Sequence, residues 1–396
     1  MEQSPIVCRR SGPAPATVLP QRVNFLLTPA LSLALALMGV TNPALAQTLN
    51  DPRLQAEVVA TGLLNPTTMA FVAPGDLLVL QKDNGQVRRI LDGVLQPAPV
   101  LDVAVHFSSE RGLLGIALDP DFLNNRFVYL YYTESATGLD TSSSSSTPLG
   151  NRVYRFVWNG SGAGTLQAPT LLLDLPATPG PNHNGGALAF GPEDALYAVI
   201  GELNRTGKLQ NNPLGADPDD TGVILRVDRD GRPLADNPFA GQTGPASLMP
   251  RVYAYGVRNS FGLVFDPATG RLWDSENGPN VYDEINQVGP GFNSGWTAIM
   301  GPDARDPQGQ ADLWQAPGSV YRDPQFSWAV PVAPTALSFV RNRLLGCDLQ
   351  GDLIVGDNNC GQLYRFGLNA SRDALVLTST PLQDRVADNG SLVCSA

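Results

Sequence analysis

One histidine stands in a polar setting that could support proton transfer. The chain has only two histidines, His106 and His183, so a metal site built from several histidines is excluded. His183 lies in the polar run Asn182–Gly186, whereas His106 stands between a valine and a phenylalanine. A neutral imidazole can accept a proton near pH 7. His183 is therefore the candidate base; the alternative is a structural histidine.

Other polar side chains stand where they could meet His183. Each comes just before or after a short apolar segment, at comparable points of the chain: Glu110, Glu202, Arg258 with Asn259, residues 275–280, and Asp283 with Glu284. If those segments are inner strands of one ring of sheets, their ends converge in space. For any single cluster, the alternative is a turn former or a solvated charge.

The elements that would position these groups form a repeat. Five apolar triplets alternate as β-strands do and end at residues 71, 118, 190, 265 and 339. Four are followed at once by a turn that contains proline, and another apolar strand follows each turn. The last three steps are 72, 75 and 74 residues. A constant period of strand hairpins is typical of a β-propeller rather than of a stacked β-sandwich.

The N-terminus has the features of an export signal. Three arginines precede the apolar run Leu31–Val40, and Ala44–Ala46 form a small-x-small cleavage pattern. The run is too short for a membrane anchor, which needs about 20 apolar residues. We expect a signal peptide at 1–46, one domain at 47–396, a periplasmic or secreted location, and no membrane span in the mature chain.

Charge and cysteines limit the remaining possibilities. Loss of residues 1–46 removes a net charge of +2, so the chain goes from −11 to −13. Such a surface repels phosphate backbones, and nucleic-acid binding is not expected. An exported protein with Cys347, Cys360 and Cys394 should form one disulfide. The pair Cys347–Cys360 is favoured, although Cys394 could replace either partner. Zinc binding is disfavoured because no CxxC motif is present.

Seven segments, in order along most of the chain, resemble the soluble PQQ-dependent sugar dehydrogenases, the glucose/sorbosone dehydrogenase family. They are Arg111–Phe122, His183–Gly186, Ile224–Asp228 through Ala235–Phe239, Tyr255–Asn259, Ser275–Pro279, Asp283–Asn286 and Asn293–Trp296. One such motif would be weak, but seven in order make a chance resemblance improbable. The resemblance implies a six-bladed, all-β propeller with PQQ at the channel mouth, a sugar substrate, and an electron acceptor that the sequence does not identify.

The resemblance also implies catalytic roles for single residues. His183 would take the proton of the anomeric hydroxyl while a hydride passes to the quinone. Glu202 would orient His183, in place of a family aspartate that is one methylene shorter. Arg258 would stabilise the negative charge that develops on the reduced quinone.

Cofactor and metal contacts follow from the same resemblance. The implied cofactor-binding residues are Glu110, Arg258, Asn259 and Arg385. Calcium would be held by the backbone carbonyls of Gly278 and Pro279 together with the cofactor, and oxygen ligands suit this hard cation. Asp283 and Glu284 could bind there too or only cap a turn.

The chain departs from the family's pattern in four places. Asn359 and Cys360 precede Gly361, where the family usually has a lysine or arginine. The final strand offers only Arg385, and Trp328 is one position out of register for an aromatic lid. The chain ends early in a sixth blade, which we expect a strand at Leu54–Val59 to complete.

Two other functions stay open beside PQQ-dependent oxidation of aldose sugars. PQQ is a tricarboxylate, so fewer cations predict weaker binding. The chain could therefore be a non-catalytic propeller that has lost its cofactor. It could also be a calcium-dependent propeller lactonase, although such an enzyme needs several side-chain ligands in the channel.

Overall fold

Short antiparallel strands make up most of the regular structure. The computed structural model describes residues 51–244, 247–305 and 309–388. The first sheet joins β1 (Pro66–Ala73), β2 (Asp76–Gln81) and β3 (Gln86–Leu91) with the short strands β4 (Val94–Leu95) and β5 (Leu101–Asp102). The second sheet has the order β6 (Leu113–Leu118), β7 (Phe127–Glu134), β8 (Gly150–Asn159) and β9 (Thr165–Leu175).

The other three sheets begin in the same way, with consecutive antiparallel strands. The third has the order β10 (Leu188–Phe190), β11 (Leu196–Ile200), β12 (Val223–Val227), β13 (Val252–Tyr255), β17 (Phe292–Asn293) and β18 (Val320–Tyr321). The fourth has the order β14 (Ser260–Phe265), β15 (Leu272–Glu276), β16 (Asp283–Val288), β19 (Phe326–Trp328) and β23 (Val386–Ala387). The fifth consists of β20 (Pro334–Phe339), β21 (Leu353–Asp357) and β22 (Leu363–Phe366). Parallel pairing occurs where the short strands β17, β18 and β23 join their sheets.

The predicted repeat of strand hairpins is confirmed. Each apolar triplet lies in the first strand of its sheet, and the apolar run that follows it forms the antiparallel second strand. In the first four sheets, the predicted proline turn joins these two strands. Proline suits a turn because its φ angle is fixed and it has no N–H for the strand ladder.

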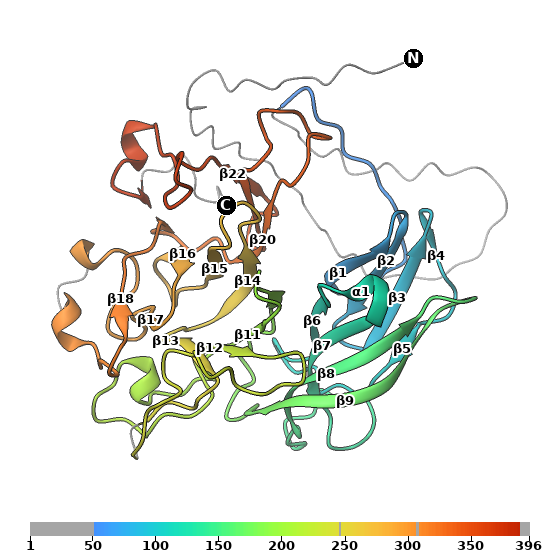
Figure 1. Ribbon diagram of the computed structural model, residues 1–396, viewed down its shortest axis with the longest axis horizontal. Helices are drawn as coiled ribbons and strands as arrows, with labels where there is room; N and C mark the ends of the chain where they lie inside the picture. Colours follow the sequence, from blue (N-terminus) through green and yellow to red (C-terminus); the bar gives the residue numbers. More distant parts are fainter. Residues whose placement is uncertain (1–50, 245–246, 306–308, 389–396) are drawn as a thin grey trace.

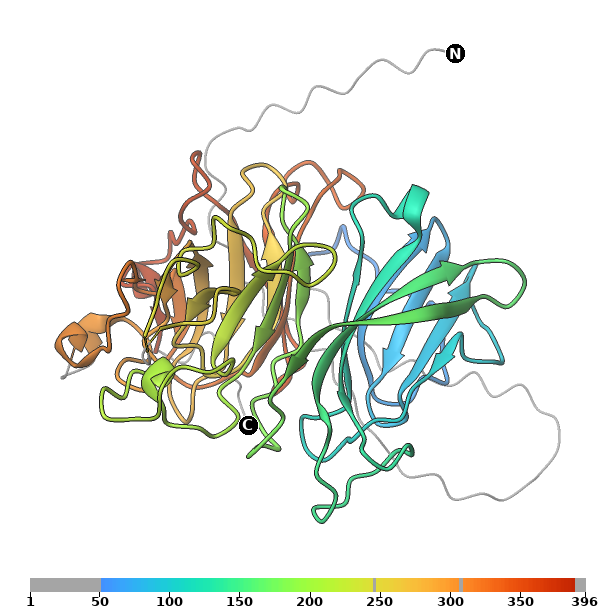
Figure 2. The same ribbon diagram turned by 60° about the horizontal axis from the view of Figure 1, so that its bottom comes forward.

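Successive sheets pack face to face around a common centre. Leu114 and Tyr131 of the second sheet, for example, share one buried cluster with Leu196 and Leu225 of the third. Among the first strands, β1 contacts β6, β6 contacts β10, β10 contacts β14, and β14 contacts β20. Figure 1 shows the sheets following one another round this centre in chain order, and Figure 2 shows the loops at both ends of the strands. This arrangement is typical of propeller blades.

The predicted sixth blade is not confirmed, since the described residues contain five such sheets. The segment Leu54–Val59, expected to complete that blade, is not a strand and is mostly exposed. A strand needs a neighbouring edge for its N–H and C=O groups, and no described strand pairs with this segment. On β1, Met69 and Phe71 accordingly stay 62% and 64% exposed.

Helical structure is limited to single turns in the described ranges. These turns are α1 (Phe122–Asn125), η1 (Lys208–Gln210), η2 (Asp303–Arg305), η3 (Gly309–Asp312) and η4 (Thr380–Leu382). None of them has the length and apolar character needed to cross a membrane. The predicted signal peptide at 1–46 lies outside the described residues.

Two of the cysteines are oxidised. Cys347 and Cys360 are both disulfide-bonded, and their pairing with each other stays a prediction. Cys394 lies outside the described residues. The two cysteines flank β21 of the fifth sheet.

Candidate active site

Polar groups from three sheets converge at one end of the inner strands. Glu110, His183 and Arg258 stand just before β6, β10 and β14, the first strands of neighbouring sheets. Glu202 and the run Asn277–Pro279 follow the second strands β11 and β15. Because second strands run antiparallel to first strands, the ends of β11 and β15 lie beside the starts of β10 and β14. The convergence expected from the repeat is therefore present.

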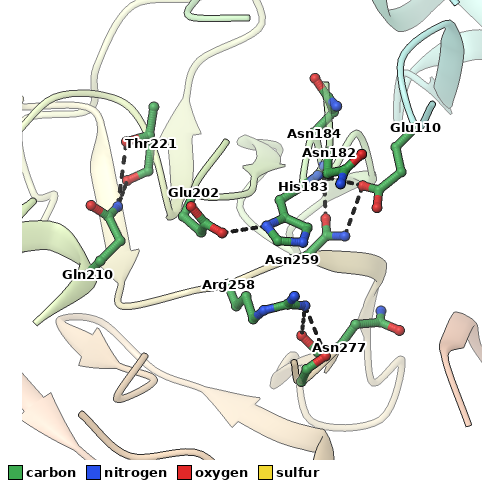
Figure 3. A network of polar contacts seen from close by, with 12 residues as sticks. Glu110, Asn182, His183, Asn184, Glu202, Gln210, Thr221, Arg258, Asn259 and Asn277 are labelled. Carbon is green, nitrogen blue, oxygen red and sulfur yellow. Dashed lines mark hydrogen bonds and ion pairs between the residues drawn. The ribbon is translucent and has the colours of Figure 1, made fainter. Parts of the chain in front are cut away.

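His183 and Glu202 form the central pair of this cluster. Nδ1 of His183 is hydrogen-bonded to Oε1 of Glu202 (Figure 3). The two side chains are 12% and 4% exposed. A carboxylate can only accept, so in the neutral imidazole Nδ1 carries the proton and Nε2 keeps its lone pair. No hydrogen bond joins Nε2 to a described residue, and the extra methylene of Glu202 does not prevent its contact with the ring.

Two glycines allow the backbone around this pair to approach closely. A Cβ on Gly201 would lie 2.3 Å from the carbonyl oxygen of His183 and 2.8 Å from that of Arg258. Gly185 has φ +63°, and a Cβ there would lie 2.6 Å from the carbonyl oxygen of Val199. Both positions therefore require glycine, because any larger residue would push the strand ends apart.

Arg258 lies beside the pair and is partly buried. Its Nη1 donates to the carbonyl oxygens of Asn277 and Gly278, at 2.9 Å each (Figure 3). Its guanidinium also lies over the ring of Trp296, 5.2 Å from the centroid. Burial lowers the pKa of Arg258, and the nearby carboxylates, Glu202 first among them, oppose that shift. Arg258 is thus a fixed positive charge next to His183.

Glu276, the last residue of β15, holds the backbone of Arg258 in place. Its Oε1 accepts the backbone N–H of Arg258 at 2.6 Å, and its Oε2 accepts the hydroxyl of Ser294. Burial raises the pKa of Glu276 to about 7. Sequence reasoning assigned no individual catalytic or binding role to Glu276 or Trp296, although both lie inside the family-like segments. What they contact depends on how the sheets meet, which no local motif records.

Asp283 and Glu284 serve the neighbouring turns. The carboxylate of Asp283 accepts three backbone N–H groups, those of Gly278, Val332 and Ala333, at 2.6–2.8 Å. Burial raises the pKa of Asp283. Glu284 accepts the backbone N–H of Gly301 at 2.6 Å. The structure therefore matches the turn-capping alternative for these two acids.

Asp274 lies in β15 and is fully buried next to Glu276. Burial first, and the charge of Glu276 second, raise its pKa well above the ordinary range, while Ser260 and Asn286 partly oppose this. An unfolded aspartate loses its proton near pH 4, but the folded protein keeps it to higher pH. The native state then binds more protons than the unfolded state, so stability falls as pH rises.

Replacing Asp274 with asparagine should remove this loss of stability at higher pH. We expect Asp274→Asn and the wild type to differ least in melting temperature at about pH 4, where the unfolded aspartate begins to lose its proton. The variant should become increasingly more stable as the pH approaches about 8. Thermal unfolding across this range measures the effect, with exposed Asp92→Asn as the control. Parallel curves for Asp274→Asn and wild type at every pH would contradict the assignment.

Two residues considered in the sequence analysis, Arg385 and Trp328, lie away from the cluster. Arg385 precedes β23, which is the fifth strand of its sheet counted from β14. At about 4.8 Å per strand this is roughly 19 Å from the start of β14, so the structure does not bring Arg385 to Arg258. Trp328 is fully buried among Phe326, Tyr364 and Phe366 and belongs to the core rather than to a lid.

The second histidine is structural. His106 is fully buried, and its Nε2 lies 3.2 and 2.9 Å from the carbonyl oxygens of Ser143 and Ser146. This contact ties the serine-rich loop to the segment that precedes β6. The sequence distinction between the two histidines therefore agrees with their surroundings.

The side chains of the cluster suit the redox-active end of PQQ better than they suit the three carboxylates of that cofactor. His183 offers a free ring nitrogen, and the Nε of Arg258 is buried with no hydrogen-bond partner. The other cations close by are occupied: Lys82 donates to the carbonyls of Ser109 and Arg111, and Arg111 donates to that of Ala177. One arginine thus faces the site where a tricarboxylate would need several cations.

A metal ion at this site would depend on backbone oxygens. In the described part of the chain, no group of three or more His, Cys, Asp or Glu side chains is arranged to hold one. The carbonyl of Gly278 is directed at the guanidinium of Arg258, so it points into the cluster. Pro279 follows it on the exposed rim. These carbonyls are donors of the kind that calcium accepts.

Comparisons with known proteins agree with this arrangement. The sequence model of the family "Glucose / Sorbosone dehydrogenase" matches residues 63–388. An uncharacterised protein of Synechocystis sp., slr1608, is 30% identical over 355 residues, which cover 86% of this chain and 82% of that protein. The aldose sugar dehydrogenase YliI of Escherichia coli is 29% identical, over 69% of this chain and 67% of its own. The PQQ-bound aldose sugar dehydrogenase of Streptomyces coelicolor superposes with a TM-score of 0.62 at 31% identity, covering 81% and 82% of the two chains.

Proposed function

Because the chain belongs to the glucose/sorbosone dehydrogenase family, we propose that it oxidises aldose sugars at the anomeric carbon, with PQQ as its redox cofactor and Ca²⁺ bound beside it. The observation that carries this proposal is the pair His183–Glu202, which leaves one imidazole nitrogen free next to a buried guanidinium. The product would be the corresponding lactone.

The protein's main task is to remove one proton at a fixed place. Glu202 keeps the ring proton of His183 on Nδ1, so Nε2 accepts the proton of the sugar's anomeric hydroxyl. PQQ, when bound, supplies the two-electron acceptor that takes the hydride from the anomeric carbon. Glu202 then stabilises the resulting imidazolium, because a carboxylate beside Nδ1 favours the charged ring.

Arg258 provides positive charge where negative charge develops. It is fixed by two carbonyls and by Trp296, so no reorganisation is needed during the reaction. In the proposed complex, Arg258 and Asn259 would hold the cofactor, and the carbonyls of Gly278 and Pro279 would hold the calcium ion. Arg385 is not part of this set.

Reconstitution with cofactor tests the proposal directly. Purified protein mixed with PQQ and Ca²⁺ is expected to melt at a higher temperature than protein alone, because a ligand that binds only the folded state stabilises it. The same mixture should reduce an artificial electron-accepting dye when an aldose is added. A panel of aldoses defines the preferred sugar, and a non-reducing sugar alcohol, which lacks an anomeric hydroxyl, is the control substrate.

A non-catalytic propeller is the second candidate, and the scarcity of cations around Arg258 is the observation that favours it. Calorimetric titration separates the two. Measurable PQQ binding with calcium present supports the dehydrogenase, whereas no heat of binding at high micromolar PQQ supports the non-catalytic protein. Hydrolysis of a lactone without PQQ would instead indicate a lactonase.

Export of the protein is part of the proposal. We place the mature chain in the periplasm or outside the cell, with cleavage after Ala46. N-terminal sequencing of the mature protein checks the cleavage site.

A further inference from the structure

We propose that Glu110 is a positioning residue that fixes the backbone of the proposed base, His183. Its accepting oxygen atom is what matters for this role, and its negative charge is not required. This inference rests on the proposed function, because it concerns the same base. It gives Glu110 a task inside the protein, separate from the predicted contact with the cofactor.

The geometry around Glu110 is a clamp on the loop that carries the base. Oε2 of Glu110 accepts the backbone N–H of His183 at 2.6 Å and the side-chain N–H of Asn259 at 3.0 Å (Figure 3). Asn259 in turn accepts the backbone N–H of Gly185 through Oδ1, at 3.3 Å. Two N–H groups of the loop, at 183 and 185, are thus held by one carboxylate and one amide.

His183 needs such a clamp because its backbone is in an unfavourable conformation. Its φ is +60°, in the left-handed region that residues other than glycine seldom occupy. Such conformations persist only where the surroundings impose them. The bond from Oε2 of Glu110 holds the N–H of this same residue, so it stabilises the strained conformation directly.

The backbone decides where the free ring nitrogen points. Glu202 fixes only Nδ1 of His183, and a ring held at one atom can still swing about that contact. Once the backbone N–H is also fixed, the ring has two anchors on opposite sides of the residue, and the direction of Nε2 is determined. A base displaced by about 1 Å loses much of its efficiency, because proton transfer requires hydrogen-bond contact.

The bonds from His183 and from Asn259 both end on Oε2 of Glu110. The other oxygen, Oε1, has no hydrogen bond to a described residue. The clamp therefore requires one acceptor atom, which a glutamine amide also supplies through its carbonyl oxygen. The charge of Glu110 is not needed, and it lies close enough to Arg258 to oppose the burial-induced lowering of that residue's pKa.

The test compares two variants of equal length, Glu110→Gln and Glu110→Met. Methionine keeps the volume but removes the acceptor, so we expect kcat for aldose oxidation to fall about 10- to 100-fold, as for other groups that orient a catalytic residue. The KM for the sugar should change little. Glutamine should restore most of the activity that methionine loses. Equal losses in both variants would overturn the neutral-acceptor role, and wild-type kcat in Glu110→Met would overturn the clamp.

A second measurement needs neither cofactor nor sugar. The chain has two histidines, so nitrogen-15 histidine labelling gives two sets of ring signals, and buried His106 is an internal control. In Glu110→Met the signals of His183 should shift or broaden, while those of His106 stay in place and show that the protein is folded. Glu110→Gln should leave both sets near their wild-type positions. Unchanged His183 signals in Glu110→Met would contradict the inference, whether or not the protein oxidises sugars.

Discussion

Replacing His183 with alanine is expected to lower kcat/KM for aldose oxidation by about 10²- to 10⁴-fold, the usual contribution of a general base. We expect this loss because Nδ1 of His183 is bonded to Glu202, which leaves Nε2 free to accept the proton of the sugar. Steady-state dye reduction with PQQ and Ca²⁺ present measures the loss. Calorimetry should find cofactor binding largely retained, since the side chain is assigned to proton transfer.

The other histidine provides a matched control. In His106→Gln the amide nitrogen of glutamine can take the place of Nε2 and donate to the carbonyls of Ser143 and Ser146. This variant should keep the activity of its folded fraction. Added imidazole should partly restore His183→Ala, because a small base can enter the space left by the ring. Full activity in His183→Ala would exclude the residue as the base.

Replacing Arg258 with methionine is expected to reduce the rate of the chemical step by about 10²- to 10³-fold, as when a fixed donor to a developing negative charge is removed. Arg258 is held by the carbonyls of Asn277 and Gly278 and by the ring of Trp296. Its charge is therefore in place before the reaction begins. Single-turnover reduction of PQQ-loaded protein, followed by absorbance, isolates this step from reoxidation by the dye.

Arg271→Met is the matched control for Arg258→Met. Arg271 stands at the start of β15, at the opposite end of that strand from Glu276, and donates to the carbonyl of Ser371. The same loss of charge there should leave the chemical step unchanged. If the two variants slowed the reaction equally, general charge rather than the placement of Arg258 would be responsible.

The strand pairs of this fold were predictable from the sequence. The triplets around Phe71, Leu118, Phe190, Phe265 and Phe339 lie in first strands, because alternation and proline turns are properties of neighbouring residues. The way in which the sheets complete a ring was harder to predict from the sequence. The strand expected at Leu54–Val59 did not form, since strand formation depends on a partner edge that a sequence pattern cannot supply.

The candidate site also has one part that the sequence predicted and another part that only the tertiary structure decided. The sequence by itself determined which residue types stand at the ends of the inner strands, and hence that His183, Glu202 and Arg258 meet. A fixed repeat places its strand ends together whatever the loops contain.

Only the tertiary structure decided what each of these groups contacts. It put Glu110 on the backbone of His183, Glu276 on that of Arg258, and Arg385 on a distant strand edge. These outcomes depend on the spacing between sheets and on where side chains of different sheets end. Hydrogen bonds are decided within a few tenths of an ångström, and that is finer than any periodicity of the chain can specify.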